Sequence, residues 1–170
     1  MAEQMTSTGL DPNSVRKVAR VQAPLEIAWR VFTEQLGTWW PLANYKIGKV
    51  RAVDAVIEPS VGGRWYERGE DGSTCDWGSV LAWEPPGRLV LSWDITADWQ
   101  YDPKLKTEIE LRFFAEGENA TRVELEHRHL DRFGARRDEM RRIFDTEGDW
   151  GRVLEMFARV AATRVETRNG

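Results

Sequence analysis

One cysteine and two histidines are all that the 170-residue sequence offers for redox or metal chemistry. A single cysteine, Cys75, excludes an internal disulfide and a cysteine-based zinc cage. Catalytic zinc usually has three protein ligands, and no third ligand accompanies His127 and His129. We therefore expect no bound metal and no cofactor. For Cys75 we expect an ordinary buried thiol, because nothing basic is placed to lower its pKa.

Other functional signals are missing as well. The net charge of −4 lacks the positive excess of a nucleic-acid binder. No apolar run approaches the roughly 20 residues that span a bilayer. The first ten residues have no basic segment followed by an apolar core, so they do not form a secretory signal. Neither a glycine-rich phosphate loop nor a Gly-x-Ser-x-Gly motif is present. These absences predict a cytoplasmic protein that neither binds nucleic acid nor inserts into membranes.

Tryptophan is present in excess, with nine residues among 170. A Trp side chain is large enough to line a cavity, and its N–H needs a partner when it is buried. Ordinary packing explains any single Trp equally well. If the aromatic side chains of separate segments leave a gap, they line a pocket for a flat hydrophobic molecule, with Trp N–H and Tyr O–H groups as directional contacts. The aromatic residues that a curled sheet would bring together are Trp65, Trp77, Trp93, Phe113, Trp150 and Phe157.

The chain divides into a short tail and one domain. We expect residues 1–13 to be disordered and residues 14–166 to form a single domain. Alternation predicts a first strand over residues 15–21. A helix follows, with Pro24 at its first position and Gly37 at its end. The aromatic turn at residues 38–41 is interpreted either as an exposed contact patch, as in a homodimer, or as part of a pocket mouth.

Six more strands are predicted from alternation and turn residues, within residues 50–57, 63–68, 74–83, 88–95, 107–113 and 121–130. Their short connections imply an antiparallel meander. The last of them places on one face Val123, Leu125, His127 and His129. Most strand carboxylates are expected to point outward into solvent, since charged groups are rarely buried unpaired. These carboxylates are Glu67, Asp76, Asp94 and Glu110.

A charged connector over residues 131–144, with a short helix as one interpretation, precedes a long amphipathic helix over residues 146–165. Its apolar face is formed at helical spacing by Trp150, Val153, Leu154, Phe157, Val160 and Ala161. Thr146 and Asp149 have the spacing of a capping box. Gly148 and Gly151 weaken only the first turn. We expect this helix to be one wall of a binding site, with ligand access at its glycine-bearing end and a fixed end over residues 157–165.

Four segments in order resemble a known superfamily. They read A-P-x-E-I-A-W-R-V-F-T, G-G-R-W-Y-E-R, W-G-S-V-L-A-W-E-P-P-G-R-L-V-L-S-W and T-R-V-E-L-E-H. Over residues 15–165 the chain is similar to START-like (SRPBCC) proteins, and within them to those named after the activator of the ninety-kilodalton heat-shock protein ATPase. The resemblance implies an α+β helix-grip fold. In that fold a curved antiparallel sheet of about seven strands surrounds a long C-terminal helix, a short helical segment follows the first strand, and an apolar cavity lies between sheet and helix.

Members of this superfamily bind lipids, polyketides or other hydrophobic molecules, and a minority catalyse cyclisation, dehydration or hydrolysis. The first hypothesis is therefore a carrier of a hydrophobic small molecule. The second is a cavity enzyme with His127 as acid or base. The third is a co-chaperone that activates an ATPase. The residues expected to contact the ligand are Trp65, Trp77, Trp93, Phe113, His127, Trp150, Leu154 and Phe157.

Overall fold

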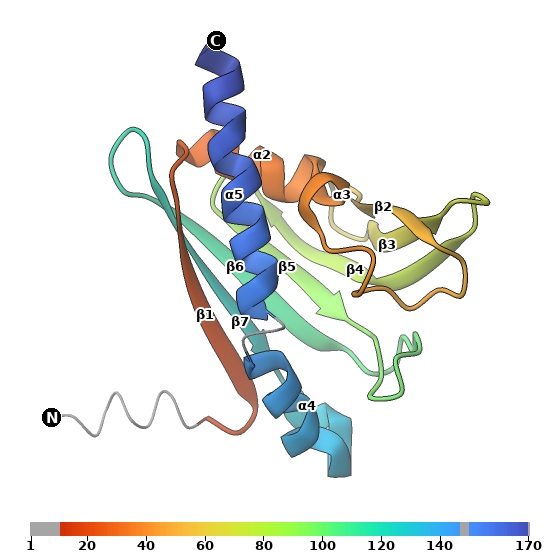
Figure 1. Cartoon of the computed structure of the whole chain (residues 1–170). Coiled ribbons are helices and arrows are strands. Elements are labelled where there is room, and N and C mark those ends of the chain that lie inside the picture. The colour runs from red at the N-terminus through yellow and green to blue at the C-terminus, as the bar shows by residue number, and fades with distance from the viewer. Residues whose placement is uncertain (1–10, 147–149, 170) are drawn as a thin grey trace, which may run out of the picture.

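The computed structural model describes residues 11–146 and 150–169. Within them, one sheet has the strand order β1-β7-β6-β5-β4-β3-β2, and every neighbouring pair is antiparallel. The expected meander is confirmed, because β2 to β7 lie side by side in chain order and only β1 crosses over to pair with β7 (Figure 1). The strands are β1 (Ser14–Val21), β2 (Ala52–Ile57), β3 (Arg64–Gly69), β4 (Thr74–Glu84), β5 (Arg88–Trp93), β6 (Thr107–Ala115) and β7 (Thr121–Arg128).

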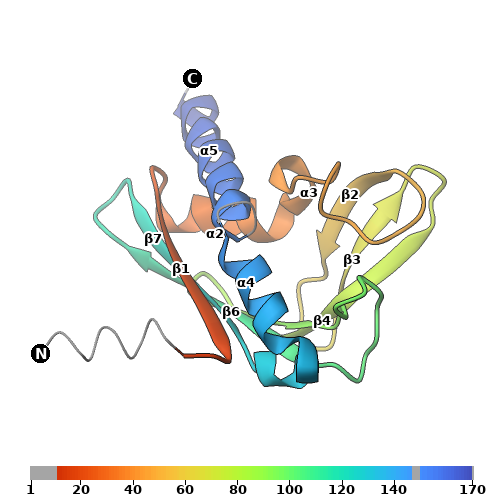
Figure 2. The ribbon, with the colours of Figure 1, turned by 60° about the horizontal axis from the view of Figure 1, so that its bottom comes forward.

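The helices lie on the concave side of this sheet and at its ends. Figure 2 shows α4 and α5 in the hollow of the sheet, with β1 and β7 on one flank and β2 and β3 on the other. This arrangement is the α+β helix-grip fold that was expected. No helix of the described residues is long and apolar enough to cross a membrane. The helices are α2 (Leu25–Glu34), α3 (Leu36–Trp39), the 3-10 helix η1 (Leu130–Arg136), α4 (Arg137–Asp145) and α5 (Trp150–Asn169).

The curvature of the sheet comes from irregular pairing in β2 to β5. The register shifts within the β2–β3, β3–β4 and β4–β5 pairs, and such bulges bend and twist a sheet locally. Gly78 marks one close approach, because a Cβ there would lie 1.9 Å from the Ser92 carbonyl oxygen and 2.6 Å from Trp65 Nε1. Only glycine lets the Trp65 indole lie across β4 and donate to Ser92 O at 2.8 Å.

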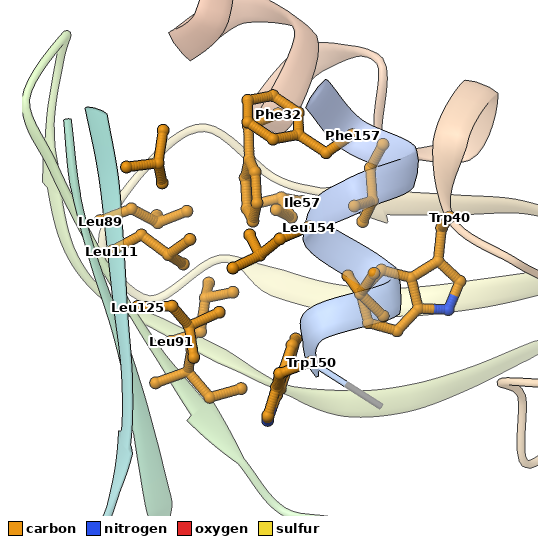
Figure 3. Close-up of a cluster of buried hydrophobic side chains, with 14 of the residues drawn as sticks. Phe32, Trp40, Ile57, Leu89, Leu91, Leu111, Leu125, Trp150, Leu154 and Phe157 are labelled. Carbon is orange, nitrogen blue, oxygen red and sulfur yellow. The ribbon is translucent and has the colours of Figure 1, made fainter. Parts of the chain in front are cut away.

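The core lies between the concave face and α5. Alternate residues of β7 are buried, as the sequence pattern predicts, whereas β5 is buried on both faces from Leu89 to Trp93 and β6 has a buried run from Ile109 to Leu111. Figure 3 shows Leu89, Leu111 and Leu125 projecting from the sheet toward Leu154 of α5. The predicted apolar face of the helix is confirmed for its buried members, which are Trp150, Val153, Leu154, Phe157 and Ala161. These side chains fix the helix on the sheet.

The first helix begins and ends differently from the prediction. Pro24 is the N-cap residue, with ψ of 156°, rather than the first helical residue. The helix ends at Glu34 because Gln35 leaves the helical conformation, and Gly37 lies inside the separate helix α3. Trp39 Nε1 donates to Val31 O at 2.8 Å, which folds α3 back onto α2. A hydrogen bond from the indole of the next helix, rather than a glycine, therefore marks this boundary.

The long helix predicted from residue 146 is shorter at its start. Thr146 has an extended conformation after α4, and its Oγ1 donates to Ile143 O at 3.0 Å. In the described residues α5 begins at Trp150. The proposed capping partner Asp149 and Gly148 lie outside the described residues, as do residues 1–10 of the expected tail. Asn13 O accepts a hydrogen bond from Leu130 N at 3.0 Å, just before β1.

Candidate functional site

A cavity of about 430 Å³ lies at the Trp150 end of α5. Its wall comes from the segment after α3, from β4, β5 and the segment after β5, and from α4 and α5. Such a volume lies within the usual range of small-molecule pockets, about 300–1,000 Å³. The aromatic residues that line it are Trp40, Tyr45, Trp77, Trp93, Trp99, Phe144 and Trp150.

The rest of the lining is aliphatic apart from two residues, Asn44 and Lys46. Lys46 Nζ donates to Gly48 O and to Val50 O, so its ammonium group ties its own loop together. The cavity therefore offers a ligand a predominantly apolar surface. The aliphatic members are Ile47, Ile95, Ile143 and Val153.

The indole N–H groups of the buried lining tryptophans have partners inside the protein. Trp40 Nε1 donates to Tyr45 O at 2.8 Å, and Trp93 Nε1 donates to Ile95 O at 3.1 Å. Trp77 Nε1 donates to Glu67 Oε1 at 2.9 Å, and Trp150 Nε1 donates to His127 Nδ1 at 3.2 Å. The expectation that such N–H groups would be directional ligand contacts is wrong for these four, because each N–H serves to fix its ring. The rings present only carbon surface to the cavity.

Glu67 is the acceptor for Trp77 and is only 2% exposed, although it was expected to point outward. Its Oε1 also accepts from Ile47 N at 2.7 Å, and its Oε2 accepts from Gly48 N at 3.1 Å. A carboxylate buried with several donors is stabilised by them. Glu67 thereby fixes both a cavity wall and the loop that closes over it.

Two more carboxylates expected in solvent are also buried, Asp94 and Glu110, each 3% exposed. Asp94 accepts from Ser92 Oγ and Lys106 N. Although burial alone would raise the pKa of Glu110, hydrogen bonds from Arg112, Arg88 and Arg128 lower it to about 2. The expectation fails for these groups because donors on neighbouring segments, Lys106 N for Asp94 and Arg88 and Arg128 for Glu110, join the donors two residues away in sequence.

Two polar residues of β4 lie beside this region. Asp76 is half-buried and accepts from Arg64 Nε at 2.8 Å. Cys75 is half-buried, and burial together with the charges of Glu67 and Asp76 raises the pKa of its thiol. A raised pKa disfavours the reactive thiolate, so Cys75 has the character of an unreactive thiol.

His127 lies one layer behind the cavity wall and is fully buried. Its ring contacts the rings of Phe144, Trp93 and Trp150, with centroid distances of 4.4, 5.4 and 5.9 Å. Burial lowers the pKa of His127 to about 3, so the ring is neutral at physiological pH.

The hydrogen bonds of His127 define which nitrogen carries the proton. Thr107 Oγ1 donates to Trp93 O at 2.8 Å, so it accepts from His127 Nε2 at 3.0 Å. His127 Nδ1 is then unprotonated and accepts from Trp150 Nε1. Both nitrogens are engaged, and neither faces the cavity. His127 therefore fixes the orientation of the Trp150 ring through this hydrogen bond.

His129 does not share the face of His127, so that prediction is wrong. Strand β7 ends at Arg128, and His129 has a left-handed backbone with φ of 64°. This turn directs its side chain outward, where it is 42% exposed and its Nε2 lies 3.7 Å from Glu108 Oε1. Among the described residues no group of three or more His, Cys, Asp or Glu side chains could hold a metal ion.

The residues predicted to contact a ligand fall into two groups. Trp77, Trp93 and Trp150 line the cavity. Buried elsewhere, without lining it, are Trp65, Phe113, His127, Leu154 and Phe157. A role in ligand binding stays a prediction for all eight.

Sequence reasoning missed several lining residues. Trp40 comes from the aromatic turn at residues 38–41 and lines the cavity. Because Trp40 is only 7% exposed, the turn is not an exposed contact patch, and the interpretation as part of the pocket mouth remains. Trp99 is 45% exposed and lies in the loop between β5 and β6. Phe144 was placed in the charged connector. Only for Trp40 did the sequence carry a signal, the run of aromatic residues before Pro41.

Comparisons with known proteins agree with this architecture. The profile of the family described as "Activator of Hsp90 ATPase homolog 1-like protein" matches residues 22–162. A solved anthrahydroquino-γ-pyrone synthase, Txn09, is 35% identical, with a TM-score of 0.62 and coverage of 89% of this chain and 99% of that chain. The self-sacrificing resistance protein CalC from Micromonospora echinospora is 30% identical, with a TM-score of 0.66 and coverage of 90% and 96%.

A third solved structure shows the same fold at lower identity. Protein NE0264 from Nitrosomonas europaea is 14% identical, with a TM-score of 0.65 and coverage of 90% of this chain and 96% of that chain. No curated protein matches the chain. The profile match extends over most of the sequence, and two solved relatives are at least 30% identical over nine-tenths of it. The chain therefore belongs to the family of Activator of Hsp90 ATPase homolog 1-like proteins, within the START-like (SRPBCC) superfamily.

Proposed function

We propose that the protein binds a flat, hydrophobic aromatic small molecule in the 430 Å³ cavity. The observation that carries this proposal is a wall of aromatic rings whose buried indole N–H groups are all occupied inside the protein. Such a wall recognises ring shape and apolar surface rather than hydrogen-bonding groups. The 35% identical relative is named as a synthase of an anthrahydroquino-γ-pyrone, a fused-ring molecule, which supports the same ligand class.

Filling the cavity tests this proposal. Ile143 is partly buried and lines the cavity, so Ile143→Trp would occupy ligand space. Met156 has intermediate burial on α5 and does not line the cavity, so Met156→Trp adds similar bulk elsewhere. In a thermal-shift screen with three-ring aromatic compounds, we expect ligand-induced stabilisation of the wild type and of Met156→Trp, and none for Ile143→Trp. Equal stabilisation of both variants, or none of the wild type, would refute the proposal.

A cavity enzyme is the second candidate, and the synthase name of the 35% identical relative favours it. His127 was the predicted acid or base, yet it lies behind the cavity wall with both nitrogens engaged. The polar groups at the cavity itself belong to Asn44, Tyr45 and Lys46. Turnover of a linear or partly cyclised aromatic precursor by the wild type would establish catalysis. Loss of that turnover in His127→Ala, with the fold retained, would return His127 to the mechanism.

Two partner hypotheses from the sequence remain predictions. The family description refers to an ATPase activator, and a pull-down with an ATPase assay on the chaperone tests that activity. A homodimer is tested by sedimentation of the purified chain. We rank both below ligand binding, because the cavity gives ligand binding a defined location.

A further inference from the structure

A second hollow of about 540 Å³ adjoins the aromatic cavity. The two share Ile47 and Trp99 in their linings, so one ligand could extend from one into the other past these side chains. We call the second hollow the outer cleft. Its remaining wall comes from residues 48–49, from the start of β3 and of β4, and from residues 100–101. It lies on the solvent side of the cavity, since Trp99 and Tyr101 are 45% and 40% exposed.

The outer cleft differs from the cavity in chemistry. Arg64 Nε and Nη2 donate to Asp76 Oδ1 at 2.8 and 2.6 Å, and Nη2 also donates to Thr74 Oγ1 at 3.1 Å. These bonds fix Asp76, which lines the cleft, through its Oδ1 and leave its Oδ2 available as an acceptor. Lys49 and the Gln100 side chain make no hydrogen bond or ion pair within the described part of the chain. The cleft therefore presents more donors and acceptors than the cavity, whose polar lining residues are Asn44, Tyr45 and Lys46.

Charges of both signs surround the outer cleft. Lys49 and Arg64 are opposed by Asp76, and Asp102 lies close enough to Tyr101 to act on its charge. Burial and nearby carboxylates raise the pKa of Tyr101, so its hydroxyl stays protonated and can donate. An ionised ligand group would meet both attraction and repulsion here. Hydroxyl groups suit the cleft better, because they donate to a carboxylate and accept from an ammonium group.

Trp99 stands at the boundary in a constrained turn. Its φ is 62°, in the left-handed region that Trp rarely adopts. The turn is held by Thr96, whose carbonyl oxygen accepts from Trp99 N at 2.8 Å and whose Oγ1 accepts from Gln100 N at 3.3 Å. Its indole contributes to both linings. Aromatic faces pack well against the C–H surfaces of saturated rings as well as against flat rings, so Trp99 suits a ligand that passes from one to the other.

We propose that the outer cleft is a second subsite, which binds an uncharged, hydroxyl-rich substituent such as a sugar ring on the aromatic ligand. This inference rests on the proposed function, since the rings of that ligand occupy the cavity. Saturated hydroxylated rings would face Trp99 while their hydroxyl groups meet Asp76 and Lys49. The aromatic part supplies apolar burial in the cavity, and the substituent supplies hydrogen bonds in the outer cleft.

A pair of probes tests the second subsite, namely 1,8-dihydroxyanthraquinone and its mono-O-glucoside. Titration calorimetry compares the wild type with the double variant Lys49→Ala/Gln100→Ala, whose replaced side chains are exposed and make no contact that the fold needs. Lys104→Ala is the matched control, because Lys104 is exposed in the loop that carries Trp99 and lines neither hollow.

We expect the double variant to weaken glucoside binding about fivefold or more, as two lost hydrogen bonds imply, and to leave the Kd of the aglycone within about twofold. Lys104→Ala should change neither. If both probes bind the wild type and the double variant equally well, the outer cleft is not a subsite while the proposed function stands. Suppose that neither probe binds the wild type, but another ring compound does and Ile143→Trp abolishes its binding. The proposed function then stands, and the proposal of a glycosylated aromatic ligand is refuted. If no ring compound binds at all, both proposals fail.

Discussion

The buried part of helix α5 runs from Trp150 to Ala161, and its two ends both carry aromatic side chains but leave different amounts of space. At one end Phe157 is fully buried, and its ring lies 5.2 Å from Phe32 and 5.3 Å from Trp39, measured between centroids. At the other end Trp150 lies 5.7 Å from Trp93 and 6.1 Å from Trp40, next to a cavity of about 430 Å³. An excess of aromatic residues therefore does not by itself indicate a pocket.

What differs is the structure that covers each end. The Phe157 end is covered by helices α2 and α3, whose side chains fill the space against the sheet (Figure 3). The Trp150 end is covered largely by two loops, at residues 40–47 and 95–99. These loops place apolar side chains such as Trp40, Ile47 and Trp99 at the cavity wall but leave the space between them unfilled. The cavity forms where loops supply most of the cover, together with Ile143 and Phe144 of α4.

Removing Phe157 should have the largest effect on stability. Phe157→Ala deletes a fully buried ring at the filled end, and such truncations cost about 3–5 kcal/mol. Urea denaturation measures the loss in free energy of unfolding. Phe157→Leu, which keeps most of the volume, should lose less than half as much and still bind ring compounds. A loss below about 1 kcal/mol for Phe157→Ala would show that this end is not tightly filled.

Replacing Glu67 should destabilise the loop at residues 47–48, which covers the cavity. Glu67→Gln keeps the shape but replaces one acceptor oxygen by an NH₂ group that faces a backbone donor. Leaving a buried donor without its acceptor costs about 1–3 kcal/mol. Hydrogen exchange of the Ile47 and Gly48 amides should then accelerate by tenfold or more. Glu126→Gln, at a half-exposed surface pair, should change stability by no more than about 0.5 kcal/mol.

The Trp150 end should also be the pH-sensitive end. The pKa of His127 is about 3 in the folded protein, against an ordinary value of 6.5. Between these values the unfolded chain binds a proton that the folded protein does not, so stability falls as pH falls. From pH 7.5 to 5.5 we expect a loss of about 1.4 kcal/mol, the equivalent of one pKa unit.

The variant His127→Gln isolates this contribution. Urea midpoints of the variant should be flat over the same pH range, even if its stability is lower throughout. The pH range in which His127 alone is tested ends at about pH 4.5, the ordinary pKa of Glu110. Between that value and its folded pKa of about 2, the unfolded chain binds a proton at Glu110 that the folded protein does not, so the protein loses further stability as pH falls. An equal pH slope in wild type and variant would contradict the buried, neutral state of His127.

The sequence predicted the filled end better than the hollow one. Alternation in β6 and β7 and the helical spacing of Val153, Leu154 and Phe157 identified the core, because each pattern repeats within one regular element. Trp99 and Phe144 were missed because loops and short connectors carry no such period. Glu67 was misplaced because its donors lie 10, 19 and 20 residues away in the sequence.

Trp99 gives the smallest expected change in stability and the sharpest contrast with Phe157. It is 45% exposed, and its left-handed backbone costs a non-glycine residue roughly 1–2 kcal/mol. Trp99→Gly relieves that strain but gains backbone entropy in the unfolded chain, about 0.5–1 kcal/mol, so its stability should match or slightly exceed that of the wild type. Trp99→Ala keeps the strain and should be about 1 kcal/mol less stable than Trp99→Gly.

In Trp99→Gly and Trp99→Ala, ligand affinity should fall even where stability does not. Both lose the indole that lines the cavity, so both should bind ring compounds about tenfold more weakly, the equivalent of about 1.4 kcal/mol. At the filled end the aromatic side chain of Phe157 stabilises the fold, whereas at the open end the proposed role of the strained Trp99 is to contact the ligand. If Trp99→Gly bound ring compounds as tightly as the wild type, Trp99 would be an incidental surface side chain. The function would then rest on the buried wall of Trp40, Trp77, Trp93 and Trp150 alone.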